Sequence, residues 1–307
     1  MTIRKELMYR NFSSMVAILL LASVVMAQTR TAQKPAAKLG TAPSTKANLP
    51  SEETVNAFMQ QMFGYDSSVS WKIGDIQPAK AEGLAEVPVT LMTPQGPQQV
   101  TLYVTADGKH AIVGEIMPFG AKPFVETREA LEKGVNGPAR GPANSAVTIV
   151  EFSDLQCPHC KQAQPIIEKL LSDEPNARIV FQSFPLPSHN WAAKAAAYAD
   201  CVGRASNDAF WKFVQKTYDA QEQITESNAD EKLTAIANDS GVKGADIAVC
   251  AAKPETTARV QQSIALGKSV DVSGTPTVFV NGYKLRNLGM PPEMLKSLVN
   301  FEAKQGK

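Results

Sequence analysis

The spacing of apolar residues first predicts a small unit that begins near residue 51. A helix is indicated by Ser51-Glu52-Glu53-Thr54, which resembles a capping box, and by the helically spaced apolar residues after it. Strand-like stretches follow at 69–76, 83–91, 98–105 and 109–117. Asp107-Gly108, between the last two stretches, predicts a hairpin. We therefore expect an α+β domain over 51–120, without a cluster of titratable residues.

A second pattern begins at residue 147 and runs to the end of the chain. It predicts in order a strand, a helix, a strand, a long helical block at about 188–270, a strand, an Asn-Gly hairpin and a closing helix. Helical crossovers of this kind require a mixed, partly parallel sheet that is covered on both faces. This predicts an α/β domain over 144–307. The intervening residues 121–143, with several Gly and Pro, are expected to form a linker with a short helix.

The N-terminal segment indicates export. Three basic residues precede an apolar run over 15–26, which ends in Val25-Met26-Ala27-Gln28. The run is short for a membrane span, so we expect a signal peptide over 1–27, cleaved after Ala27; an uncleaved anchor is the alternative. Either would make the protein periplasmic or otherwise exported. Residues 28–50 contain few large apolar side chains and are expected to be a disordered linker.

Charge and cysteine content narrow the function classes. The formal net charge is +1 and no basic stripe is present, so nucleic acid is not an expected partner. The four cysteines, at 157, 160, 201 and 250, are an even number in an exported chain, which permits disulfides.

The candidate chemistry lies in Cys157-Pro158-His159-Cys160, at a strand-to-helix junction. The free N–H groups and the dipole of a helix start favour a thiolate at Cys157, and Cys160 follows one turn later. A zinc site usually needs a second ligand pair at suitable spacing, and haem attachment needs His where Lys161 stands. We therefore predict a redox-active Cys157–Cys160 disulfide, with no other cofactor and no metal.

Together with Glu151 and Gly274-Thr275-Pro276-Thr277, this motif resembles the DsbA family of exported thiol–disulfide oxidoreductases, over about 147–299. The resemblance implies a thioredoxin-like fold with an inserted helical domain, here preceded by the small α+β domain. It implies that Cys157 attacks and Cys160 resolves the mixed disulfide. Pro158 suits the first helical turn and His159 is expected to tune the thiolate.

The same resemblance assigns two further parts of the site. Glu151 is expected to be a buried acid that moves a proton to or from Cys160; an edge-strand glutamate facing water is the alternative. Thr275-Pro276 matches the cis-proline loop that faces the cysteine pair. Threonine before this proline resembles the isomerase branch, so the direction of the reaction stays open. His110 and His189 are expected to be structural or surface residues.

Cys201 and Cys250 both fall in the helical block, and we predict a structural disulfide, with free thiols or an electron relay as alternatives. Residues 51–117 loosely resemble the dimerisation domain of the DsbC and DsbG isomerases, and this resemblance implies a possible homodimer. The implied partners are reduced or unfolded exported proteins and a membrane quinone-linked redox partner. The expected function is disulfide formation in client proteins; an isomerase or reductase, a non-enzymatic periplasmic chaperone and a metal-binding protein are the alternatives.

Overall fold

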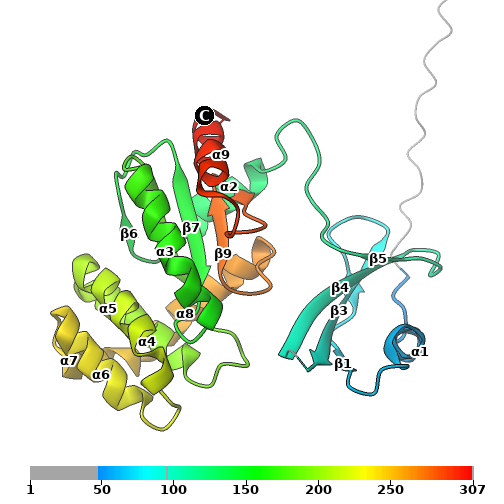
Figure 1. Cartoon of the computed structure of the whole chain (residues 1–307), viewed down its shortest axis with the longest axis horizontal. Helices are drawn as coiled ribbons and strands as arrows, with labels where there is room; N and C mark the ends of the chain where they lie inside the picture. The colour runs from blue at the N-terminus through cyan, green and yellow to red at the C-terminus, as the bar shows by residue number, and fades with distance from the viewer. Residues whose placement is uncertain (1–47, 95, 306–307) are drawn as a thin grey trace, which may run out of the picture.

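The computed structural model describes residues 48–94 and 96–305 (Figure 1). The predicted signal peptide and nearly all of the predicted 28–50 linker lie outside these residues. Within the described residues, no helix is long and apolar enough to cross a membrane.

The first unit is one helix against an antiparallel sheet. Helix α1 (Glu52–Phe63) begins at Ser51, whose hydroxyl accepts a hydrogen bond from the Thr54 N–H (3.1 Å). The strands are β1 (Ser70–Ile73), β2 (Gln77–Pro78), β3 (Leu84–Thr93), β4 (Gly96–Thr105) and β5 (Ala111–Val113), in the order β1-β3-β4-β5 with β2 also on β3.

One face of this sheet carries the core. Burial alternates along β3, and the buried side chains pack against Val55 and Met59 of α1. The Asp107-Gly108 hairpin is confirmed by the antiparallel pairing of β4 with β5. In β2, Pro78 pairs with Ala85 of β3. It lies in a two-residue strand, a position that tolerates the missing N–H.

The second unit has a mixed sheet, in the order β10-β9-β7-β8-β6. Its strands are β6 (Ala139–Arg140), β7 (Thr148–Ser153), β8 (Arg178–Ser183), β9 (Thr277–Val280) and β10 (Tyr283–Lys284). β7 and β8 are parallel, and the other pairs are antiparallel. The expected mixed sheet is therefore confirmed, with β7 between two other strands.

Helices cover both faces of this sheet (Figure 1). Helices α3 (Pro158–Asp173) and α9 (Pro292–Gln305) share a core with Ile149 of β7 and Ile179 of β8. On the other face, α2 (Val125–Gly134) and α8 (Pro254–Ser269) pack around Phe152. The inserted helices are α4 (Ala192–Ala205), α5 (Asn207–Asp219), α6 (Ala229–Ser240) and α7 (Gly244–Ala251), with a 3-10 turn at Gln221–Gln223.

Residues 121–143 contain the predicted short helix as α2, and this segment also packs against the second unit. Leu131 of α2 is buried against the sheet, and Ala139 of β6 pairs with Val180 of β8. A Cβ at Gly137 would collide with the carbonyl oxygen of Phe181, so this glycine permits close packing against β8. The Gly and Pro content of this segment therefore reflects tight packing as well as turns.

Candidate active site

The two cysteines of the sequence motif lie where β7 leads into α3. Cys157 is the N-cap residue of α3, and its carbonyl accepts the N–H groups of Cys160 (3.1 Å) and Lys161 (3.2 Å). Pro158 occupies the first helical position, where an N–H would have no partner within the helix. The local sequence therefore sets the helix start at the first cysteine.

The pKa values of the two thiols are shifted in opposite directions. Hydrogen bonding from the Cys160 thiol lowers the pKa of Cys157 to about 5, with further help from Thr275 and from the N–H groups of the first helical turn. Burial, followed by the nearby Cys157 sulfur, raises the pKa of Cys160. At neutral pH the arrangement holds a thiolate at Cys157 and a thiol at Cys160.

Both cysteines are less accessible than an exposed helix start would suggest. Cys157 is 3% exposed and Cys160 is fully buried, whereas the side chains of Pro158 and His159 are exposed. The inserted helices explain the difference, because the cysteines belong to the same apolar cluster as residues of α4, α5 and α6. From the 3-10 turn at Gln221–Gln223, Gln221 donates hydrogen bonds to the carbonyls of Leu155 (2.9 Å) and Cys157 (3.2 Å).

The loop before β9 faces Cys157. The Thr275–Pro276 peptide bond is cis, and the Thr275 carbonyl oxygen lies 3.4 Å from Cys157 Sγ. The Thr275 hydroxyl is buried, lies close enough to Cys157 to lower the pKa of its thiol, and has no other hydrogen-bond partner among the described residues. A hollow of about 580 Å³ lies beside this loop and is lined by residues 273–277, by Lys284, Leu285 and Arg286, and by Glu115.

Glu151 lies on β7, the strand between β8 and β9, and is 1% exposed. The position excludes the alternative of an edge-strand glutamate facing water. Gln164 Nε2 of α3 donates to Glu151 Oε1 (2.9 Å). Burial raises the pKa of Glu151 to about 7, against smaller lowering effects of Ser153 and Gln164. The carboxyl can therefore gain and lose a proton near neutral pH.

Ser153 is a site residue that the sequence reasoning missed. Its side chain lowers the pKa of both Glu151 and Cys160, which places the hydroxyl within reach of the two groups. It also hydrogen-bonds the hydroxyl of buried Tyr218 (2.8 Å). The sequence could have indicated this role, because alternate residues of a strand lie on the same face and Ser153 is two positions after Glu151.

Asp154 is a second missed residue, and it changes the interpretation of His189. Its buried carboxylate accepts the N–H groups of Gln156 (2.7 Å) and Leu186 (2.8 Å) and lies 2.7 Å from His189 Nδ1. Its own N–H faces Cys160 Sγ at 3.5 Å. His189, expected to be a structural or surface residue, thus contacts the loop that carries the cysteine pair. His110 is exposed in the β4–β5 turn region.

The Cys201–Cys250 disulfide predicted from the sequence is present and joins α4 to α7, with a Cα–Cα distance of 6.0 Å. Cys157 and Cys160 are both free thiols. Across the described part of the chain, no three His, Cys, Asp or Glu side chains form a group able to hold a metal ion.

Comparison with known sequences gives two kinds of relative. The chain is 32% identical over 144 residues to "Na(+)/H(+) antiporter NhaA 3" of Salinispora tropica, a match that covers 47% of this chain and 21% of the antiporter. It is 27% identical over 175 residues to "Probable disulfide bond formation protein D" of Bacillus anthracis, covering 54% of this chain and 77% of that protein. The chain thus spans only about a fifth of the antiporter.

Among solved structures, the oxidised form of BdbD from Bacillus subtilis is similar in fold, with a TM-score of 0.50 and 23% identity. The match covers 56% of this chain and 98% of BdbD. The sequence profile of the family described as Thioredoxin matches residues 133–300, more than half of the chain. These residues include α3, the cis-proline loop and the inserted helices, and the chain belongs to this thioredoxin family.

Proposed function

We propose that this protein is an exported thiol–disulfide oxidoreductase that forms disulfides in client proteins through the Cys157–Cys160 pair. One observation carries the proposal: the pKa of Cys157 is lowered and that of Cys160 is raised, beside a loop with a cis proline. A stabilised thiolate favours the reduced form of such a pair, which makes the disulfide form a good oxidant. The Bacillus relatives named as disulfide bond formation proteins support the same reaction class.

In the proposed reaction, a client thiolate attacks Cys157 Sγ of the oxidised protein. The Cys157–Cys160 bond breaks and Cys160 leaves as a thiolate, which takes up a proton because its pKa is high. A second client thiolate then attacks the client sulfur of the mixed disulfide. Cys157 leaves as a stable thiolate, and two electrons have passed from the client to the protein.

Glu151 is the proposed proton donor for Cys160. Its pKa of about 7 allows it to be protonated before the reaction and ionised after it. Ser153 can connect the two groups, since it interacts with both. In the reverse reaction the same carboxylate would accept the Cys160 proton.

The cis Thr275–Pro276 loop is the proposed binding site for an extended client segment. Its backbone faces Cys157, and the adjacent hollow is lined by Lys284 and Arg286 as well as Glu115. Hydrogen bonds to the backbone of this loop would bind segments of varied sequence, as a protein with many clients requires. His159, exposed in the first turn of α3, is proposed to tune the thiolate when protonated.

An isomerase or reductase is the second candidate. Thr275 before the cis proline and the separate α+β unit favour it, and such a protein would be kept reduced instead of being reoxidised by a membrane quinone-linked partner. A homodimer through the first unit is part of this alternative. Apolar side chains exposed on α1 and β5 supply contact surface for it, namely Phe58, Met62, Ile112 and Val113.

The reduction potential of the Cys157–Cys160 pair tests the proposal. The protein would be equilibrated with glutathione, its free thiols trapped, and each cysteine quantified by mass spectrometry. A reduction potential of about −120 mV would support the proposed oxidase activity, and one of about −270 mV would contradict it. Cys157→Ser is the matched variant for client oxidation and should be inactive. If Cys157→Ala/Cys160→Ala still prevents client aggregation, chaperone activity is separate from the redox pair.

A further inference from the structure

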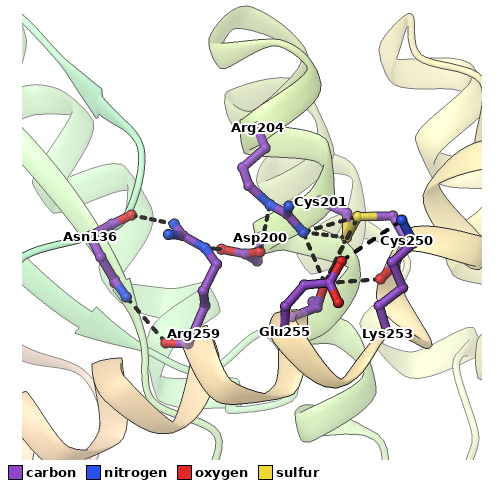
Figure 2. Close-up of polar contacts among 9 residues, drawn as sticks. Asn136, Asp200, Cys201, Arg204, Cys250, Lys253, Glu255 and Arg259 are labelled. Carbon is purple, nitrogen blue, oxygen red and sulfur yellow. Dashed lines mark hydrogen bonds and ion pairs between the residues drawn. A yellow bond between two sulfur atoms is a disulfide. The ribbon is translucent and has the colours of Figure 1, made fainter.

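The Cys201–Cys250 disulfide lies in a charged cluster at the start of α8 (Figure 2). Arg204 Nη2 of α4 lies 3.3 Å from Cys201 Sγ and 3.0 Å from Cys250 Sγ. The same nitrogen donates to the hydroxyl of buried Thr256 (2.8 Å). A disulfide that only cross-links two helices needs no such donor, because its sulfurs are weak hydrogen-bond acceptors.

The guanidinium of Arg204 is held in this position by other side chains. Its Nε donates to Asp200 Oδ2 (2.9 Å), and the other oxygen of Asp200 accepts from Arg259 Nε (2.8 Å). Arg259 is fixed in turn by the carbonyl of Asn136 (2.9 Å), and Figure 2 shows this chain of contacts reaching from the sulfurs to Asn136. The donor is therefore preorganised against the two sulfurs.

The charges of the cluster are unbalanced while the disulfide is closed. Arg204 and Arg259 share the single carboxylate of Asp200, which leaves one positive charge beside two neutral sulfurs. At the start of α8, Lys253 and Glu255 form an ion pair (3.8 Å), so their charges cancel each other. One thiolate at the sulfurs would neutralise the cluster, so the surroundings favour the opened form in its ionised state.

We propose that Cys201–Cys250 is a second thiol–disulfide exchange site, at which Arg204 stabilises the thiolate that leaves when a small anionic thiol of the glutathione class opens the bond. The thiol attacks as its thiolate on Cys250 Sγ, because Cys250 is half-buried whereas Cys201 is 2% exposed. A mixed disulfide with Cys250 forms, and Cys201 leaves as a thiolate facing Arg204. A disulfide is broken fastest when the departing thiol has a low pKa.

A second thiolate of the same class completes the step by attacking the small-molecule sulfur of the mixed disulfide. Cys250 is released, the small thiol leaves as its own disulfide, and two electrons have entered the protein. Cys250 takes up one proton from solvent, and Cys201 remains ionised beside Arg204. This chemistry uses neither Cys157 nor Cys160, so it is independent of the proposed function.

The test uses the full exported chain with Cys157→Ser/Cys160→Ser, so that only the second pair can exchange. The protein is mixed with glutathione buffers, samples are alkylated over time, and the reduced fraction of Cys201 and Cys250 is measured by mass spectrometry. Adding Arg204→Met should slow opening about tenfold, as expected for loss of a charge-assisted hydrogen bond to the leaving sulfur. The matched control is Lys253→Met, which removes one positive charge at the same helix start and should leave the rate unchanged.

Two results would overturn the proposal. One is an Arg204→Met rate equal to that of the parent, and the other is an equal slowing by Lys253→Met, which would indicate only a general charge effect. Arg204→Lys keeps the charge and should retain part of the rate, so it serves if the methionine variant folds poorly. In the Cys157→Ser/Cys160→Ser protein with the Cys201–Cys250 bond reduced, ultraviolet titration should show one thiolate that persists at pH values below the ordinary cysteine pKa. The absence of this signal would also contradict the role of Arg204.

Discussion

Cys157→Ser should remove a pH-dependent stabilisation of the reduced protein. The pKa of Cys157 is about 5 in the folded chain, whereas an unfolded cysteine titrates at about 8.5. Because the folded pKa is lowered, the stabilisation is complete above about pH 8.5 and is lost as the pH falls through about 5. At 1.36 kcal/mol per pKa unit, this amounts to about 5 kcal/mol at high pH and about 3 kcal/mol at pH 7.

Urea unfolding of the reduced wild type and of reduced Cys157→Ser measures this contribution directly. The difference in the free energy of unfolding should rise by about 1.4 kcal/mol per pH unit between about pH 5 and pH 8.5. Cys201 and Cys250 are common to both proteins, as is Glu151, so their titrations largely cancel. The oxidised wild type is the second control, because it holds no Cys157 thiolate and should show no such slope relative to the variant.

A difference that stays flat from about pH 5 to pH 8.5 would refute the reasoning. It would mean that the donors around Cys157 do not stabilise its thiolate, and the main physical argument for an oxidising pair would be lost. A slope confined to pH values above about 8 would indicate an ordinary thiol and carry the same consequence.

Further expectations follow from the other buried groups. In urea unfolding, Glu151→Gln should leave the free energy of unfolding unchanged near pH 4 and raise it by about 3–4 kcal/mol above about pH 7. The reason is that the raised pKa of this carboxyl makes its ionisation unfavourable for the folded state. The same variant should slow client oxidation in stopped-flow assays. Thr275→Val should raise the pKa of Cys157 and reduce its alkylation rate near pH 5 about threefold, since it removes a hydroxyl that can donate to the thiolate. Cys201→Ser/Cys250→Ser should lower the melting temperature by roughly 10 °C, as the lost cross-link is worth about 4 kcal/mol by chain entropy.

The sequence was sufficient for features that depend on local signals. The Asn281-Gly282 hairpin is formed by two residues with positive φ, 48° and 88°, which is what the dipeptide predicts. The helix start at Pro158 follows from a proline placed directly after Cys157. These elements are determined by a few neighbouring residues, so no knowledge of distant contacts was needed.

Features that depend on distant contacts could not be predicted in the same way. Gly137 and the two-residue strand β6 appeared to be part of a linker, because the partner strand β8 lies about 40 residues further along the chain. The burial of Cys157 depends on the cis-proline loop and on the inserted helices. His189 reaches Asp154 across 35 positions of sequence. Single-sequence periodicity contains no information about which distant residue provides such a contact.

The end of β7 shows how the missed part of the site could have been inferred. Glu151 and Ser153 interrupt the apolar residues of β7, the central strand of its sheet, and Asp154 follows directly after the strand. A buried polar side chain costs free energy unless it is hydrogen-bonded, and a strand can accommodate several together only if neighbouring elements supply partners. Here Gln164 bonds Glu151, and Tyr218 bonds Ser153. The interruption of the apolar pattern therefore locates the site as specifically as the cysteine motif does, and it further indicates that the site contains a polar network as well as two sulfurs.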